Sequence, residues 1–226
     1  MNSFVASVLQ LNPRVAAFDC DGTLWSGDAG ESFFTWEIKR GIVSRSLGER
    51  MQARYTEYKS GRVSESEMCG EMVTMHAGMP ESVLMRAARD FLAHSFPGHV
   101  FPEMRALVQA LLARGCDVWA VSSSNEWVIR VAMKEFGIAE DHVLAAAVEV
   151  DDGVATDRLI RIPSGPGKPK ALGDVVRGTI DAAFGNSRWD TEMLEMAQHA
   201  FAVNPNPDLL TVAQTHGWTV YFPEQV

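Results

Sequence analysis

Residues 15–24 read Val15-Ala16-Ala17-Phe18-Asp19-Cys20-Asp21-Gly22-Thr23-Leu24, a short apolar run followed by two aspartates one residue apart. The apolar run suits a strand that is buried on both faces, as in a parallel sheet. Residues i and i+2 of an extended chain point to the same side, so Asp19 and Asp21 can address one point in space. Gly22 lets the backbone turn sharply as it leaves the sheet. Ligands of open parallel sheets bind beyond the carboxyl ends of the strands, and we predict a site here.

The same residues also suit a solvated turn, because Asp and Gly are ordinary turn residues. A short motif stays a hypothesis until its surroundings in the chain agree with it. The rest of the sequence therefore decides between a turn and a site.

Size and composition indicate a globular protein with an acidic balance. The chain of 226 residues suits one large domain, or a core with a smaller inserted module. The apolar fraction of 46% is ample for a packed core, and the net charge of −9 argues against nucleic acid or an anionic membrane as partner. An odd number of widely spaced cysteines predicts reduced thiols in a cytoplasmic protein: Cys20, Cys69 and Cys116. We expect no signal peptide in residues 1–10, and no membrane span, because no stretch approaches ~18 continuous apolar residues.

Helical signals fill the region between residues 25 and 100. The expected helices cover residues 31–40, 46–60, 64–78 and 80–95. Ser46 with Glu49, and Ser64 with Glu67, form capping-box patterns at the starts of the second and third helices. The five methionines between residues 68 and 85 indicate adaptable packing rather than a cofactor site. We predict a small helical bundle inserted after the first strand.

Beyond residue 100, apolar strands alternate with helices. The expected strands cover residues 116–121, 143–150, 154–162, 180–184, 200–203 and 218–222. The second and third of these strands are expected to form a hairpin around Asp151-Asp152-Gly153. Strands that alternate with helices predict right-handed crossovers and an α/β fold with a doubly wound parallel sheet.

Four groups of polar residues stand directly after apolar runs or at helix starts. They are Asp19 with Asp21, then Ser122, then Lys168, then Asn186 with Asp190. Each of the later groups is a weak signal alone, since a Ser after a strand is usually a helix cap and a loop Lys is usually solvated. In this order and spacing, the four groups resemble the four signatures of the haloacid dehalogenase-like hydrolases. The resemblance covers residues 15–203.

The resemblance implies a phosphatase. A phosphate monoester is a dianion, so a carboxylate nucleophile needs a divalent cation and fixed donors around the phosphoryl oxygens. By resemblance, Asp19 is the nucleophile that forms an aspartyl-phosphate, and Asp21 first protonates the leaving alcohol and then activates water. The same resemblance implies that Ser122 and Lys168 bind the phosphate. Lys170 is an alternative to Lys168, which we prefer because it follows a glycine directly, as the family's Lys often does.

The resemblance also implies Mg²⁺, bound by the Asp19 carboxylate, the Asp21 backbone carbonyl and a group from the fourth signature. The family pattern there is Gly-Asp with a second Asp about four residues on, whereas this chain has Gly185-Asn186 followed by Asp190. An Asn oxygen carries no charge, so we expect weaker binding of the ion. Asp190 is then either a direct ligand or a residue that orients metal-bound water.

The insert after the first signature resembles the helical cap of the phosphoserine-phosphatase-like branch. We predict a core domain of residues 1–24 and 100–226 and a cap of residues 25–99, which closes over the site and contacts the substrate beyond its phosphate. In phosphoserine phosphatases, a Glu shortly after the first signature contacts the substrate's amino group. Asp28 stands at that spacing, with Glu31 three residues further on, although Asp28 suits a turn equally well. Phosphoserine, a phosphorylated amino alcohol, a choline-like head and a small sugar phosphate all fit.

The leading interpretation is a Mg²⁺-dependent phosphatase that acts on a small phosphorylated metabolite. Dehalogenases of this fold lack the second aspartate, so Asp21 favours phosphoryl chemistry. A phosphomutase would use the same four sites but protect the aspartyl-phosphate from water. A non-catalytic protein that binds a phosphorylated ligand is the third interpretation, with Asn186 as the sign of lost catalysis. The sequence leaves the oligomeric state open.

Overall fold

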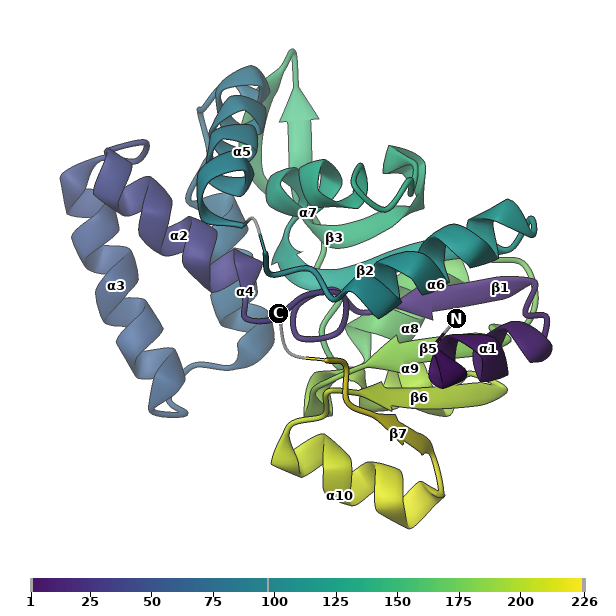
Figure 1. The fold of residues 1–226 in the computed structure, drawn as a ribbon. Coiled ribbons are helices and arrows are strands. Elements are labelled where there is room, and N and C mark those ends of the chain that lie inside the picture. The colour runs from purple at the N-terminus through teal and green to yellow at the C-terminus, as the bar shows by residue number, and fades with distance from the viewer. Residues whose placement is uncertain (1, 97, 225–226) are drawn as a thin grey trace.

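The computed structural model describes residues 2–96 and 98–224, and a seven-stranded sheet lies at its centre (Figure 1). The strand order is β4-β3-β2-β1-β5-β6-β7, and every neighbouring pair is parallel except β3 with β4. The strands are β1 (Val15–Phe18), β2 (Asp117–Asn125), β3 (Val143–Asp151), β4 (Val154–Arg161), β5 (Ala182–Gly185), β6 (His199–Val203) and β7 (Thr219–Tyr221). The first strand of the chain therefore lies in the middle of the sheet.

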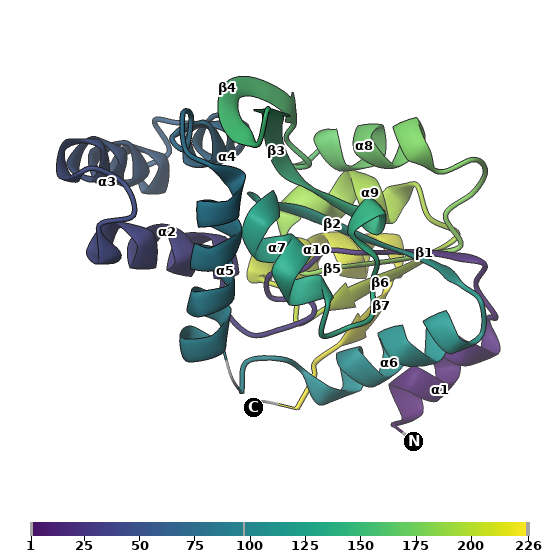
Figure 2. The same ribbon diagram turned by 90° about the horizontal axis from the view of Figure 1, so that it is seen from above.

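Helices cover both faces of this sheet (Figure 2). Ala16 and Phe18 of β1 belong to one hydrophobic cluster and Ala17 to another, because successive side chains of a strand point to opposite faces. The first cluster includes residues of α1 (Ser3–Gln10), α6 (Pro102–Ala113) and α7 (Glu126–Met133), and the second includes residues of α8 (Gly167–Val175), α9 (Thr191–Glu195) and α10 (Pro207–His216). The predicted doubly wound α/β fold is confirmed, and α1 is a helix that we did not predict.

β2 is longer than the sequence pattern predicts. The expected strand ends at Val121, but β2 runs to Asn125, with an irregular register against β3 between these two residues. The side chain of Asn125 then accepts from the Val128 amide and caps α7. The three serines before Asn125 therefore lie within the strand, whereas the sequence pattern places Ser122 just after it.

The four helices of the insert follow β1, precede α6, and lie to one side of the sheet in Figure 1: α2 (Ala29–Arg40), α3 (Arg45–Lys59), α4 (Glu65–Thr74) and α5 (Glu81–Ser95). Two of their predicted ends are wrong. The cap of α3 is Ser44, whose hydroxyl accepts from the Leu47 amide, so Ser46 lies inside the first turn. α4 ends at Thr74 rather than near Gly78, because residues 75–79 form turns and Gly78 donates its amide to Ala155 of β4.

The two chain passages that join the insert to the sheet lie side by side. Trp25 forms an antiparallel bridge with Val100, and the Ser26 amide donates to the His99 carbonyl at 2.9 Å. The main hydrophobic cluster continues across this junction, since it includes residues of α2 and α5 together with Trp25. A smaller cluster belongs to the insert alone: Phe34, Val43, Met51, Val63, Met68 and Met75. The insert thus rests on the core and also has packing of its own.

The described residues contain no helix that combines the length and the apolar character needed to cross a bilayer.

Candidate active site

A cleft of about 600 Å³ opens at the carboxyl ends of the parallel strands. Its sheet side carries residues that follow β1, β5 and β6, together with two from the last part of β2: Asp19, Asp21, Gly22, Asn186, Ser187 and Asn204, and Ser123 and Ser124. Lys168, at the start of α8, lies on the same side. Residues of the insert form the opposite wall: Asp28, Glu31, Tyr58 and Glu65. The parallel order of β2, β1 and β5 explains why sites so distant in the sequence meet at one edge.

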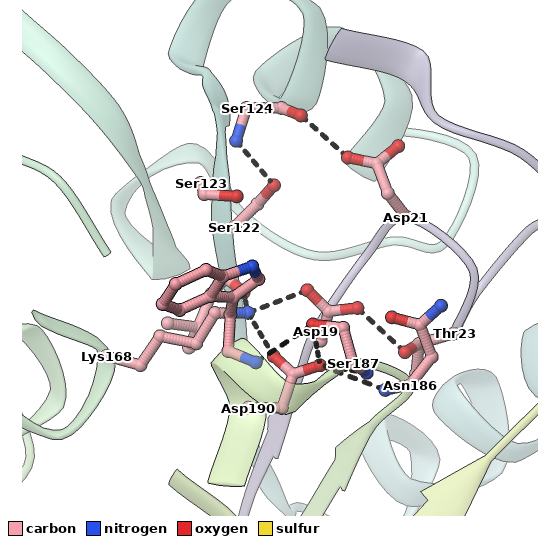
Figure 3. Close-up of polar contacts among 12 residues, drawn as sticks. Asp19, Asp21, Thr23, Ser122, Ser123, Ser124, Lys168, Asn186, Ser187 and Asp190 are labelled. Carbon is pink, nitrogen blue, oxygen red and sulfur yellow. Dashed lines mark hydrogen bonds and ion pairs between the residues drawn. The ribbon is translucent and has the colours of Figure 1, made fainter. Parts of the chain in front are cut away.

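Asp19 and Lys168 form a buried ion pair at the floor of the cleft (Figure 3). The Lys168 Nζ donates to Asp19 Oδ1 at 2.7 Å. It also donates to Asp190 Oδ1 at 2.5 Å and to the Val121 carbonyl oxygen at 2.9 Å. The other oxygen of Asp19 accepts from Thr23 Oγ1 at 2.8 Å. A donor on each carboxylate oxygen fixes the orientation of Asp19.

The structure places Lys168 in the site and Lys170 outside it. Lys170 is exposed and pairs with Asp174 on the outer face of α8. Lys168 reaches the floor because α8 begins close to the preceding segment. An added Cβ at Gly167 would lie 2.2 Å from the Ile162 carbonyl oxygen, so a glycine is required at this position.

The two polar residues of the fourth group occupy different positions. Asp190 is fully buried, and both of its oxygens are engaged: Oδ1 with Lys168, and Oδ2 with the amides of Asn186 at 3.0 Å and Ser187 at 2.8 Å. Asn186 lies on the cleft, where its side chain touches Gly22 so closely that a Cβ there would meet Nδ2 at 1.8 Å. Gly22 also has a positive φ of 77°, which favours glycine for a second reason.

Asp21 is held away from Asp19, next to the start of the insert (Figure 3). Its Oδ1 accepts from Trp25 Nε1 at 2.8 Å and from the Ala29 amide at 2.5 Å. Its Oδ2 accepts from Ser124 Oγ at 2.7 Å. Both aspartates line the cleft, but Asp19 is bound by the core and Asp21 by the junction between core and insert.

Ser122 is buried behind the cleft surface, with 1% of its area exposed. Its hydroxyl oxygen accepts from the Ser124 amide at 3.1 Å, which leaves the hydroxyl proton for a further acceptor. The next two serines, Ser123 and Ser124, line the cleft. The prediction that Ser122 binds phosphate stays a prediction.

The environment separates the two catalytic candidates by their acidity. Burial and the neighbouring Asp190 carboxylate raise the pKa of Asp19 to about 6, against the opposing effect of Lys168. Burial and the Asp28 carboxylate raise the pKa of Asp21 to about 8. Burial disfavours the charged form of Lys168, but its two carboxylate partners outweigh burial and hold the pKa above its usual value. Asp19 is therefore the stronger acid of the two carboxyl groups.

Both predicted substrate contacts, Asp28 and Glu31, lie on the wall formed by the insert. Asp28 also caps α2, because its Oδ1 accepts from the Glu31 amide at 2.8 Å. Glu31 pairs with Lys59 at 3.2 Å, and the Lys59 ammonium lies over the rings of Tyr55 and Tyr58. Each predicted residue thus has a structural contact as well as a place on the cleft.

Several residues of the cleft are not predicted from the sequence, above all Glu65. Glu65 is the first residue of α4, and its carboxylate accepts from the Tyr58 hydroxyl and from Ser123 Oγ at 3.4 Å. Burial raises its pKa. The only signal was the sequence Ser64-Glu65-Ser66-Glu67, which predicts a helix start but not what the helix faces.

Comparisons with known proteins agree with this geometry. The sequence model of the haloacid dehalogenase-like hydrolase family matches residues 16–195. The chain is 28% identical to a histidinol-phosphatase of Neisseria meningitidis serogroup C, over 92% of this chain and 97% of the relative. Among solved structures it is similar to a protein of unknown function from Bordetella pertussis, with a TM-score of 0.78 and 23% identity over 92% and 98% of the two chains. It is also similar to a phosphoserine phosphatase studied as a phospho-aspartyl intermediate analogue, with a TM-score of 0.61 and 16% identity over 94% of each chain.

The similar solved structures show a shared fold, and the match to the family's sequence model shows in addition which family the chain belongs to. It covers most of the chain and contains all four groups of site residues, from Asp19 to Asp190. The relatives and the site agree on phosphatase-type chemistry. The chain therefore belongs to the haloacid dehalogenase-like hydrolase family, as a phosphatase-like member.

Proposed function

We propose that the protein is a Mg²⁺-dependent phosphatase that hydrolyses a small phosphate monoester through an aspartyl-phosphate on Asp19. The observation that carries the proposal is the floor of the cleft, where Lys168 and Thr23 orient a buried carboxylate beneath an open space. Asp21 lies on the same cleft with a raised pKa. A nucleophile and a separate proton donor are the two groups that this reaction requires.

The reaction proceeds in two displacements. A carboxylate oxygen of Asp19 attacks phosphorus, and the bond from phosphorus to the alcohol oxygen breaks while Asp21 gives that oxygen a proton. Asp21, now ionised, then takes a proton from a water molecule, whose oxygen attacks the same phosphorus and releases Asp19. Lys168, Ser122 and the first amides of α7 are the proposed donors to the phosphoryl oxygens.

Mg²⁺ would be held by the Asp19 carboxylate, the Asp21 backbone carbonyl and the side-chain oxygen of Asn186. All three residues line the cleft, and Mg²⁺ prefers oxygen ligands from few carboxylates together with phosphate and water. The described residues contain no cluster of three or more His, Cys, Asp or Glu side chains arranged for a metal, and the proposed set needs only one such side chain. When bound, the ion offsets the charge of the phosphate. Asp190 would act indirectly, by orienting Lys168 and the amide of Asn186.

The insert is the proposed cap, and the division into residues 1–24 with 100–226 and residues 25–99 remains part of this proposal. The bridge between Trp25 and Val100 marks where the two parts join. A cap that closes there would exclude water while the phosphoryl group is transferred.

The proposed substrate is a small phosphorylated alcohol that carries a positive charge. In the described part of the chain, five carboxylates and a single cation, Lys168, line the cleft. Asp28, Glu31 and Glu65 are the three carboxylates of the insert, and the hydrogen bonds of Lys168 go to Asp19 and Asp190 instead of to them. One relative is a histidinol-phosphatase, and an ammonium-bearing phosphate ester suits an acidic wall better than phosphoserine, which has a carboxylate of its own. The acidic net charge of −9 argues against nucleic acid and anionic membranes, and the free thiols of Cys20, Cys69 and Cys116 favour the cytoplasm.

The test is phosphate release from phenyl phosphate, phosphoserine, O-phosphoethanolamine and histidinol phosphate, with and without Mg²⁺. We expect Mg²⁺-dependent release that Asp19→Asn lowers by at least about 10³-fold. Asp174→Asn, an exposed control on α8, should keep the activity of the wild type. Formation of an isomeric phosphate ester without free phosphate would favour a phosphomutase. A rise in melting temperature with phosphate but no turnover would favour a binding protein.

A further inference from the structure

The two oxygens of the Asp21 carboxyl have different kinds of hydrogen-bond partner. Oδ1 accepts from two N–H groups, Trp25 Nε1 at 2.8 Å and the Ala29 amide at 2.5 Å. An indole N–H and a peptide N–H can only donate, so Oδ1 must remain an acceptor and cannot carry a proton while both contacts hold. The carboxyl proton is thereby restricted to Oδ2.

The partner of Oδ2 is a hydroxyl group, Ser124 Oγ, at 2.7 Å (Figure 3). A hydroxyl both donates and accepts, so it can pair with Oδ2 in either protonation state. We propose that Ser124 is the positioning residue that makes Oδ2 of Asp21 the oxygen that gives and takes the proton. This inference rests on the proposed phosphatase function and assigns Ser124 a part in it.

The proton balance of the two displacements is consistent with this role. In the first, the electron pair of the breaking phosphorus–oxygen bond goes to the alcohol oxygen, which takes the proton from Oδ2. The Ser124 hydroxyl then donates to the new carboxylate. In the second, water gives its proton to Oδ2 as its oxygen bonds to phosphorus, and the Ser124 hydroxyl becomes an acceptor again.

The position of the Ser124 hydroxyl is set by elements on both sides. Ser124 belongs to β2, and its amide donates to Ser122 Oγ of the same strand at 3.1 Å. Against it lies Gly30 in the first turn of α2, where an added Cβ would be 2.2 Å from Ser124 Oγ. A methyl group at residue 30 would therefore push the hydroxyl aside without removing it, and this offers a second, independent way to disturb the contact.

The test compares two esters of nearly equal shape, phenyl phosphate and 4-nitrophenyl phosphate, in the presence of Mg²⁺. Nitrophenolate leaves readily without a proton, whereas the departure of phenolate depends more strongly on protonation. The ratio of the two kcat/KM values therefore reports proton donation to the leaving group. For Ser124→Ala we expect kcat/KM to fall about tenfold with phenyl phosphate and less than about threefold with the nitrophenyl ester. Gly30→Ala should change the ratio in the same direction.

Ser123→Ala is the matched control, because Ser123 is the neighbouring serine but contacts Glu65 rather than Asp21. It should leave the ratio of the two esters as in the wild type. Equal losses with both esters in Ser124→Ala, or no loss with either, would overturn the inference alone. A wild type that releases phosphate from neither ester would overturn the proposed function together with the inference.

Discussion

The floor of the cleft and its helical wall differ in how far their charged side chains are buried and in the partners of those side chains. On the floor, Asp19, Lys168 and Asp190 are 6%, 1% and 0% exposed, and every charged atom has a protein partner. On the wall, Asp28 and Glu31 are more open to solvent, and their partners belong to the insert: Asp28 accepts from the Glu31 amide, and Glu31 accepts from Lys59. The floor is thus arranged before a substrate arrives, whereas the wall keeps charge available for one.

From this difference we propose that the floor performs the chemistry and the wall selects the substrate. A substitution in the buried ion pair of the floor is destabilising, because it leaves the remaining charge buried without a partner. A carboxylate on a helix surface can change without unfolding the protein. Each of the following experiments either breaks this division or makes it more specific.

The largest effect is expected for Lys168→Met, which removes the cation that two buried carboxylates share. We expect a loss of about 10²–10³-fold in kcat and a fall of about 3 kcal/mol in the free energy of unfolding. Denaturant unfolding and phosphate release measure the two quantities. Lys170→Met, in the same helix turn but exposed, should change neither by more than about 0.5 kcal/mol or its equivalent in rate. A stable and active Lys168→Met would remove the distinction between floor and wall.

A smaller effect is expected from Asn186→Asp, which restores a charge next to Gly22 at the proposed Mg²⁺ position. The concentration of Mg²⁺ that gives half-maximal activity should fall about tenfold, because carboxylates bind the ion more tightly than amides. Asn206→Asp adds the same charge to the cleft at the cap of α10, where Asp also caps well. An equal change in both variants would show that general charge, and not ligation by residue 186, sets the affinity.

Asp21 belongs to both regions, and its protonation gives the pH dependence. The pKa of this carboxyl is raised to about 8, so its acid form is present below that pH and is lost above it. We expect kcat/KM with phenyl phosphate to fall as pH rises through about 8, by up to about tenfold per unit beyond it. The fall should be shallower with 4-nitrophenyl phosphate. A rate that stays constant or rises through this range would contradict proton donation by Asp21.

The smallest effect concerns selectivity alone. For Glu65→Gln we expect KM for O-phosphoethanolamine to rise about threefold, since one charged contact to the ammonium is lost. KM for ethyl phosphate, which has no charge beyond the phosphate, should be unchanged. Glu67→Gln is the control in the same turn of α4, because Glu67 pairs with Arg54 away from the cleft. Equal shifts for both esters would place Glu65 outside the recognition of the amine.

The floor could be predicted from the sequence because strand geometry carries the information. Asp19 and Asp21 follow a short apolar strand, and the carboxyl ends of neighbouring parallel strands meet at one edge. Lys168 could be preferred over Lys170 from its place after Gly167, which the structure explains by the close approach to Ile162. The order of the four groups then sufficed to bring them together.

The wall could not be predicted, because helix packing decides it. Glu65 stands in a capping pattern, and no local feature indicates that the start of α4 faces Ser123 of β2. Ser124 lies in a strand that continues past Val121, where the apolar pattern of the sequence ends. The separate positions of Asn186 and Asp190 could not be predicted either. They depend on the two amides from which the Asp190 carboxylate accepts hydrogen bonds.

The most direct test of the central claim is chemical trapping of Asp19 during turnover. The protein is mixed with Mg²⁺ and 4-nitrophenyl phosphate, quenched in acid, and reduced with borohydride, which converts an aspartyl-phosphate to homoserine. Peptide mass spectrometry then locates the modified residue. We predict homoserine at position 19, and an unmodified Asp21 in the same peptide. Continued turnover with no homoserine at position 19, or homoserine at position 21, would contradict the account.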